Sequence, residues 1–143
     1  MAVTISLYEH TAKRFVDGSN STADTFKLML CSAATFSGAN TTLAGITKTE
    51  LSTANGYTAG GATLSGVTVT QTGNDAAFDA TDVTWTASGG TLGPAAYAIL
   101  YNDTDANDPP VAFVDFGGNQ SAGDGTDFKV IWNASGIVTF TVA

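Results

Sequence analysis

The stretch AYAILYNDTDANDPPVAFVDF, from Ala96 to Phe116, gives the strongest indication of the fold. Its two apolar runs, AYAILY and VAFVDF, are rich in aromatic and β-branched residues, which favour strands. Every second residue from Tyr97 to Tyr101 falls on the same face, as the two-residue period of a β-strand requires. The polar segment between the runs ends in Asp-Pro-Pro, which is typical of a turn. The stretch therefore predicts a hairpin of two strands.

The rest of the chain repeats this pattern. Threonine, glycine, alanine and serine are abundant, and long blocks of helix-forming residues are absent. Alternating or continuous apolar runs predict further strands at 3–7, 26–30, 64–69, 83–85, 128–132 and 137–142. Turn signals separate the strands at DGSN (17–20), TGND (72–75), SGGTLGP (88–94), FGGN (116–119) and NASG (133–136). We therefore predict one antiparallel β-sandwich over residues 1–143, of jelly-roll or immunoglobulin-like type, with about eight strands.

The N-terminal part of the chain differs from the rest. EHTAKRFV, from Glu9 to Val16, predicts one short helix that Asp17-Gly18 ends. Three of the five basic residues, Lys13, Arg14 and Lys27, lie in the first 27 positions. The N-terminal ~20 residues are therefore a candidate attachment segment.

Composition limits the partners. The chain has 143 residues, of which 43% are hydrophobic and 13% charged, so it is long enough for one core and a folded surface of roughly 7,000 Å². Its net charge of −8 repels phosphate backbones, and we expect no nucleic-acid partner. No apolar run approaches the ~20 residues of a membrane helix, and we expect no membrane partner. The first residues show no basic start followed by an apolar block, so we expect synthesis in a cytoplasm.

The segment GYTAGGAT, from Gly56 to Thr63, imitates a nucleotide-binding loop. It matches the phosphate-loop pattern G-x-x-x-x-G-K-[ST] except that Ala62 replaces the lysine. The residues that follow alternate like a strand, so no helix dipole faces a phosphate. We interpret Gly56, Gly60 and Gly61 as positions that need positive φ or close backbone approach, with Tyr57 covering the edge of the core. No cofactor is predicted.

Other candidate sites are weak. Asp103, Asp105 and Asn107 resemble the start of an EF-hand loop, but Asp108 replaces its glycine and Val114 its glutamate, so a solvated turn is expected and a nonstandard Ca²⁺ site is the alternative. The chain has one histidine, His10, one cysteine, Cys31, and no hydrolase motif. We therefore predict that it is not an enzyme.

The two tryptophans allow two interpretations. Trp85 and Trp132 lie on predicted strands, where tryptophans usually anchor the core. Sugar-stacking platforms are the alternative. This alternative belongs to another class of function, that of a carbohydrate-binding module or weak glycan hydrolase.

Three segments in order carry a family resemblance. TELSTANGYTAGGATLSGVTV, FDATDVTWTASGGTLGPAAYAILYND and PVAFVDFGGNQSAGDGTDFKVIWNASGIVT resemble a family of small β-sandwich virion proteins of tailed bacteriophages. The resemblance runs from about residue 26 to the C-terminus. It implies a structural virion protein on the capsid exterior, made in the cytoplasm of a bacterial host. The expected role is capsid decoration (cement), and an accessory tail or fibre component is the alternative.

A decoration role implies specific partners. The expected partners are the major capsid protein and further copies of this chain, for which a trimer on local threefold positions fits. We predict that Lys13 and Arg14 steer docking, with Tyr8 or Phe15 as apolar contacts where they are exposed. The alternative is that residues 3–7 form an edge strand and that the two cations lie on the solvated face of the helix.

Overall fold

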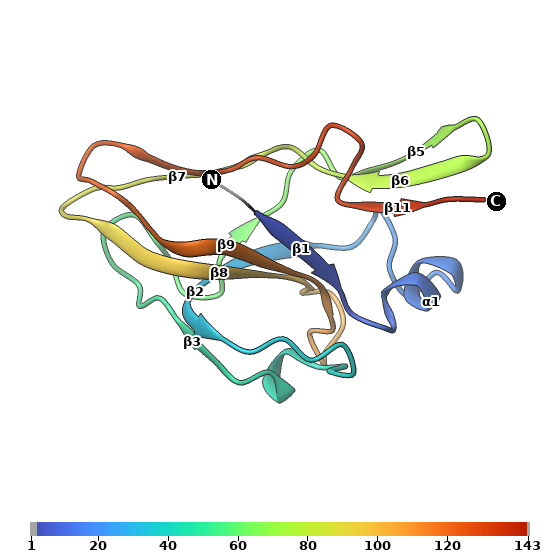
Figure 1. The fold of residues 1–143 in the computed structure, drawn as a ribbon, viewed down its shortest axis with the longest axis horizontal. Coiled ribbons are helices and arrows are strands. Elements are labelled where there is room, and N and C mark those ends of the chain that lie inside the picture. Colours follow the sequence, from blue (N-terminus) through green and yellow to red (C-terminus); the bar gives the residue numbers. More distant parts are fainter. Residues whose placement is uncertain (1–2, 143) are drawn as a thin grey trace.

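The computed structural model describes residues 3–142, and Met1, Ala2 and Ala143 lie outside this range. The described chain forms eleven strands, one short α-helix and one 3₁₀ turn, and every strand pairing is antiparallel. The strands lie in two facing layers, as in a β-sandwich (Figure 1). Its accessible surface of 7039 Å² agrees with the area expected from the chain length. The predicted all-β sandwich class is confirmed.

One layer is a six-stranded sheet built around the hairpin that the sequence predicts. In spatial order its strands are β1 (Thr4–Leu7), β9 (Pro110–Ala122), β8 (Leu92–Asn102), β2 (Phe26–Ala34) and β3 (Lys48–Glu50), and β4 (Ala62–Thr63) also pairs with β2. Strand β8 uses one edge of β2, so β3 and β4 share the other edge. On the opposite side of the sheet, β1 pairs, among the described residues, with β9 alone.

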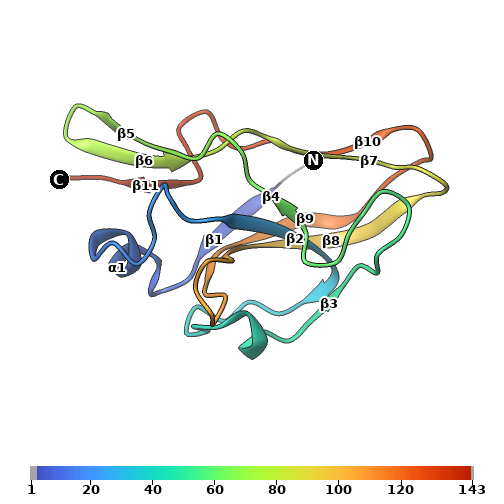
Figure 2. The ribbon, with the colours of Figure 1, turned by 180° about the vertical axis from the view of Figure 1, so that it is seen from behind.

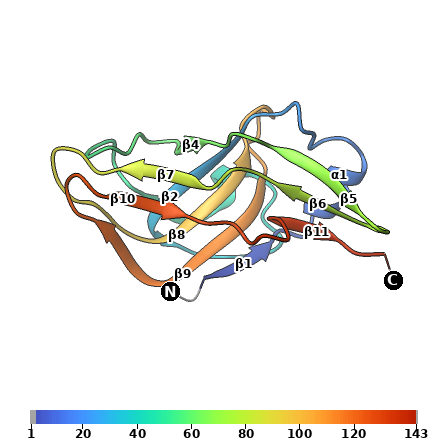
Figure 3. The ribbon, with the colours of Figure 1, turned by 90° about the horizontal axis from the view of Figure 1, so that it is seen from above.

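The second layer consists of two smaller sheets. One contains β11 (Val138–Phe140), β6 (Asp75–Asp79) and β5 (Thr68–Thr72), and the other contains β10 (Asp127–Val130) and β7 (Val83–Thr86). Seen from above, these strands cross obliquely over β8 and β9 (Figure 3). Helix α1 (Thr11–Val16) lies at the end of the molecule that carries β5, β6 and β11 (Figure 2). No helix within residues 3–142 has the length and apolar character needed to span a bilayer.

Apolar side chains cover both faces of the large sheet. Between the layers lies the inter-layer core, which includes Phe26, Leu28, Leu30, Phe78, Trp85, Leu100, Val114, Phe128 and Trp132. The other face carries the outer cluster, which consists of Tyr8, Met29, Cys31, Leu43, Ile46, Ile99, Tyr101 and Phe113. Successive residues of a strand point to opposite faces, which explains why neighbours along β2 and β8 divide between the two clusters. The free thiol of Cys31 is buried, as the sequence predicts.

Two details differ from the sequence prediction. The strand number is eleven because β3, β4 and β6 are short strands without clear alternation. The FGGN segment was predicted as a turn, and this prediction is wrong because it lies inside β9. Gly117 and Gly118 have φ of 75° and 150°. They lie across from the part of β8 near Ala95, where the register between β8 and β9 shifts. Glycine here bends a long strand instead of ending it.

Candidate functional site

The predicted attachment segment is largely occupied by contacts within the molecule. Tyr8 was predicted as a docking contact where it is exposed. It is only 2% exposed, and its ring lies 5.1 Å from that of Phe36. Burial raises the pKa of its hydroxyl above the ordinary tyrosine range. Phe15 packs on the inter-layer core, with ring centroids 4.8 Å from Phe78 and 5.7 Å from Phe140. Neither aromatic residue is a free docking contact.

The three N-terminal cations are each paired with an aspartate. Lys13 pairs with Asp17, one turn along the helix. Arg14 Nη2 lies 2.9 Å from Asp105 Oδ2, and Lys27 Nζ lies 3.0 Å from Asp103 Oδ2. The Lys13 hydrogen bond is the main cause of the lowered pKa of Asp17. These pairs reduce the positive charge on which the predicted docking surface depends, and of the two predicted docking cations Lys13 keeps a side chain that is 78% exposed.

The turn between β8 and β9 is held by these pairs. The pKa of Asp105 lies below its ordinary value, first because the Asn107 backbone N–H donates to it and then because of Arg14. Asn102 is buried and donates from Nδ2 to Asn20 Oδ1 at 2.9 Å and to Asp24 Oδ2 at 3.1 Å. This polar network, which sequence patterns did not reveal, ties the segment after α1 to the turn. Among residues 3–142 no group of three or more potential ligands is placed to hold a metal ion.

The glycines of the GYTAGG segment have the two features predicted for them, positive φ and close approach to another backbone. Gly56, Gly60 and Gly61 have φ of 91°, 98° and 89°. A Cβ at Gly61 would lie 2.0 Å from the carbonyl oxygen of Leu28, and one at Gly56 would lie 2.1 Å from that of Thr86. Such distances exclude any side chain unless the backbone moves. The loop therefore lies directly against the strands it covers.

Tyr57 fixes this loop to the edge of β2. Its hydroxyl donates to Glu50 Oε1 at 2.7 Å and accepts the backbone N–H of Leu30 at 3.1 Å. The same carboxylate oxygen accepts the backbone N–H of Gly60, and Tyr101 Oη donates to the Gly60 carbonyl at 2.6 Å. Burial, and then the Glu50 hydrogen bond, raises the pKa of Tyr57 above its ordinary range. These contacts give the loop a role in folding.

The tryptophans are part of the core. Trp85 and Trp132 are each 6% exposed. The Trp85 ring packs edge-on against Phe128 at 6.1 Å, and the backbone N–H of Trp132 donates to Asp82 Oδ1 at 2.9 Å. A sugar-stacking platform needs an exposed ring face, so the alternative use of these residues as sugar platforms is wrong.

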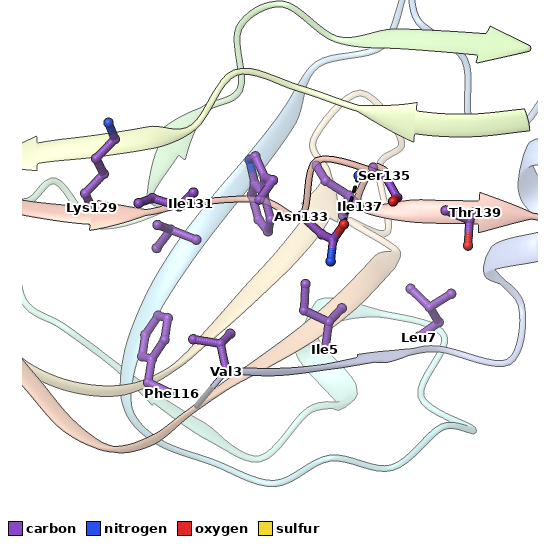
Figure 4. A pocket seen from close by; sticks show the side chains of 13 residues that line it. Val3, Ile5, Leu7, Phe116, Lys129, Ile131, Asn133, Ser135, Ile137 and Thr139 are labelled. Atoms are coloured by element: carbon purple, nitrogen blue, oxygen red, sulfur yellow. Dashed lines mark hydrogen bonds between the residues drawn. The ribbon is translucent and has the colours of Figure 1, made fainter. Parts of the chain in front are cut away.

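A groove of about 770 Å³ lies between the two layers on the β1 side. One side of the groove is formed by β1 and Phe116, and the facing side is the chain from β10 to β11 (Figure 4). We call it the β1 groove; its thirteen lining residues are Val3, Ile5, Leu7, Phe116, Lys129, Val130, Ile131, Trp132, Asn133, Ser135, Gly136, Ile137 and Thr139. The groove is a concave surface lined by both apolar and polar side chains, and its size is within the ~300–1,000 Å³ typical of ligand sites.

Exposed apolar side chains gather at this groove. Val3, Leu7 and Ile131 are 44%, 41% and 70% exposed. Lys129 is the one charged residue among the lining residues, and none of them is a carboxylate. The chain as a whole carries thirteen acidic residues, which makes this surface electrostatically distinct. Sequence reasoning identified the face formed by Val3, Ile5 and Leu7 but not the wall opposite it, because that wall depends on how the layers stack.

The chain matches no protein-family model, no curated protein and no solved structure.

Proposed function

We propose that the protein is a structural virion protein of a tailed bacteriophage, a capsid decoration protein that binds the head lattice from outside. The β1 groove carries the proposal that the protein works by binding, because apolar side chains exposed along one concave surface are typical of an interaction site. The choice of partner rests on the three sequence segments that resemble phage virion proteins. The major capsid protein is the proposed partner.

A decoration protein of this kind stabilises the capsid shell by mass action. A protein that binds the assembled shell but not its separated subunits raises the free energy needed to open the shell. Contact with two neighbouring subunits requires more than one binding surface or more than one copy. A homo-oligomer, such as a trimer on local threefold axes, meets this need. The net charge of −8 keeps a protein of high copy number soluble before it binds.

Particles made without the protein provide the test. Purified protein should bind them saturably and should raise the temperature at which the shell releases its DNA. At saturation we expect on the order of hundreds of copies per particle, as a lattice position requires. A copy number that matches a small tail ring would instead support the accessory tail role, and absence of binding to either structure would contradict the proposal.

A further inference from the structure

The sequence contains one asparagine that is followed directly by glycine, at Asn55 and Gly56. This pair is chemically labile, because glycine has no side chain to hinder attack of its backbone nitrogen on the asparagine side chain. In the reaction the Gly56 nitrogen loses its proton and bonds to Asn55 Cγ, and the side-chain nitrogen leaves as ammonia. Water then opens the cyclic imide and leaves aspartate or isoaspartate at position 55.

The two residues form the tip of a tight turn. The Tyr57 N–H donates to the Ala54 carbonyl at 2.9 Å, and the Ala54 N–H donates to the Tyr57 carbonyl at 3.1 Å. Asn55 and Gly56 have φ of 53° and 91°, and positive φ at both central residues is the conformation of a type I′ turn. Asn-Gly is a preferred pair in such turns, which explains why a labile pair stands at this position.

The folded structure restrains the Asn55 side chain. Asn55 Nδ2 donates to the Thr91 carbonyl at 2.8 Å, and the Asn55 carbonyl accepts the N–H of Ser88 at 3.3 Å. A Cβ at Gly90 would lie 3.2 Å from Asn55 Cγ, so the Gly90 backbone lies close to the carbon that is attacked. Ring closure turns this carbon toward Gly56 and expels the nitrogen that Thr91 holds. These contacts therefore oppose the reaction.

Packing also confines the attacking residue. A Cβ at Gly56 would lie 2.1 Å from the Thr86 carbonyl oxygen, so the two backbones are in close contact. No backbone carbonyl of residues 3–142 accepts the Gly56 N–H. Hydrogen bonding to the backbone therefore does not protect this nitrogen, and its protection lasts only while the turn stays packed against the end of β7.

Tyr57 holds the turn in this packed position. Its hydroxyl donates to Glu50 Oε1 and accepts the Leu30 N–H, which ties the turn to β2. Residues 52–54 and 58–59 are exposed, so little else buries this part of the chain. Segments with few buried contacts open locally at a lower free energy than the whole protein unfolds. We therefore expect the turn to lift away together with Tyr57 while the core stays folded.

We propose that Asn55 is a deamidation site of this protein and that local opening of the Tyr57 loop, residues 51–61, controls the reaction. The contacts of Asn55 keep the rate low while the loop is closed, and opening frees Asn55 and Gly56 to react. The site belongs to the chain itself, so this inference does not depend on the proposed capsid partner.

Deamidation also prevents the loop from closing again as before. Aspartate at position 55 sets a carboxylate oxygen, in place of the Nδ2 donor, against the Thr91 carbonyl, and two acceptors cannot bond to each other. Isoaspartate adds a carbon to the backbone of a turn that has no spare room beside Thr86. A transient opening thus becomes a permanent loss of the contacts at the β2 edge.

The first experiment follows deamidation of the full-length protein at mildly alkaline pH by peptide mass spectrometry. The native protein should react at position 55 at least about tenfold more slowly than the same chain unfolded in guanidinium chloride, because only the open fraction reacts. Tyr57→Phe should react several-fold faster than wild type under native conditions. Tyr97→Phe is the matched control and should react as wild type does.

A second variant distinguishes local opening from global unfolding. Val138 is 1% exposed on β11, in the small sheet that does not contain β7, so Val138→Ala destabilises the protein without touching the loop. If the loop opens locally, Val138→Ala should deamidate at the wild-type rate. Acceleration equal to that of Tyr57→Phe would show that only global unfolding exposes Asn55, and would overturn the inference.

Hydrogen exchange of the wild type tests the same point without any variant. The Gly60 N–H donates to Glu50 within the loop, so its exchange reports loop opening. The ratio of the unfolded to the native deamidation rate should match the protection factor of this amide. Equal deamidation rates in the native and unfolded chains would mean that the fold gives no protection, and the inference would be wrong.

The last measurement concerns the aged protein. After long incubation, wild type modified at position 55 should melt at a lower temperature than fresh protein. Asn55→Gly keeps a residue pair suited to a type I′ turn but has no amide to lose, so its melting temperature should not change with age. Modified wild type that melts like fresh protein would contradict the claim that deamidation prevents closure of the loop.

Discussion

The two edges of the large sheet differ in how fully their backbone groups are paired. At the β2 edge, β4, the Tyr57 loop and β3 together pair the backbone from Phe26 to Ala34. At the β1 edge, Tyr8 bonds to Val111 of β9, so the alternation of the ladder directs the backbone groups of Ile5 and Leu7 away from β9. An unpaired edge is a template for association with another chain, and proteins normally cover it. The contrast shows that this fold covers one edge of the sheet, whereas within residues 3–142 β1 pairs with β9 alone.

The largest effect on stability should come from adding a side chain at Gly61, where the loop lies against the covered edge. Gly61→Val places a Cβ 2.0 Å from the Leu28 carbonyl, so either β2 or the loop must move. We expect a loss of more than about 4 kcal/mol in the free energy of unfolding, which is in the exceptional range for one substitution. Urea denaturation measures this loss.

Gly60→Val is the matched control for Gly61→Val. Gly60 also has positive φ, but its nearest neighbour to an added Cβ is Tyr101 Oη at 3.8 Å. Its cost should be that of backbone strain alone, about 1–3 kcal/mol. Equal losses in the two variants would mean that close approach does not matter. A parent protein that binds ATP, with folded variants that do not, would return the loop to a nucleotide-binding role.

Tyr57→Phe should have the next largest effect on the covered edge. The substitution leaves the buried N–H of Leu30 without its acceptor and removes the donor to Glu50. An unsatisfied buried group costs about 1–3 kcal/mol. Tyr97→Phe is the control, since the Tyr97 hydroxyl makes no hydrogen bond within the described residues. Thermal melts that shift equally for both variants would contradict the role assigned to the Tyr57 hydroxyl.

The covered edge was partly predictable because its signals are local. Glycines at 56, 60 and 61 indicate unusual backbone, and the apolar periods of β2, β8 and β9 indicate strands. The short strands β3 and β4 were missed, because they depend on a long-range partner and not on their own composition. FGGN was misplaced for a related reason: a glycine pair is compatible with a turn or with a bulge, and only the neighbouring strand distinguishes them.

The open edge was less accessible to sequence reasoning. The N-terminal cations suggested docking, but Arg14 and Lys27 meet aspartates that are distant in the chain. Charge counted along a sequence cannot show such pairing. The apolar face of β1 was visible as an alternation, whereas Ile131 and Asn133 join it only after the layers stack. The groove is thus a product of tertiary structure.

Alkaline pH should weaken the covered edge and the outer cluster. Burial is the main cause of the raised pKa of Tyr57, Tyr101 and Cys31, and that of Cys31 rises from 9.0 to about 12. The unfolded chain ionises these groups first, so unfolding releases protons and rising pH favours it. Stability should be constant up to about pH 8, where the thiol of the unfolded chain begins to ionise, and should fall progressively from there to pH 12 and beyond.

Denaturation at successive pH values checks the alkaline prediction. Up to about pH 10 the loss should come mainly from Cys31, because ionisation of free tyrosine is then only half complete. In Tyr57→Phe the fall with pH should be shallower, since one ionising group has gone. A stability that rises between pH 9 and 12 would show that the sign assigned to these groups is wrong.

The smallest effect should come from Leu7→Pro at the open edge. Proline lacks an N–H, and its cost in a strand depends mainly on whether that N–H was bonded to a neighbouring strand. Tyr8 donates its N–H to Val111 of β9, and bonded and non-bonded residues alternate along the strand, so the N–H of Leu7 points away from β9. Only the change in side chain and backbone preference remains, and we expect a loss under about 1 kcal/mol. Ser6→Pro breaks a bond to β9 and should cost about 3 kcal/mol, as proline does where it removes a main-chain bond. Chemical denaturation of the two neighbours measures the difference directly. If Leu7→Pro is the more damaging substitution, the phase of β1 is reversed, and the backbone groups that point away from β9 are those of Thr4 and Ser6.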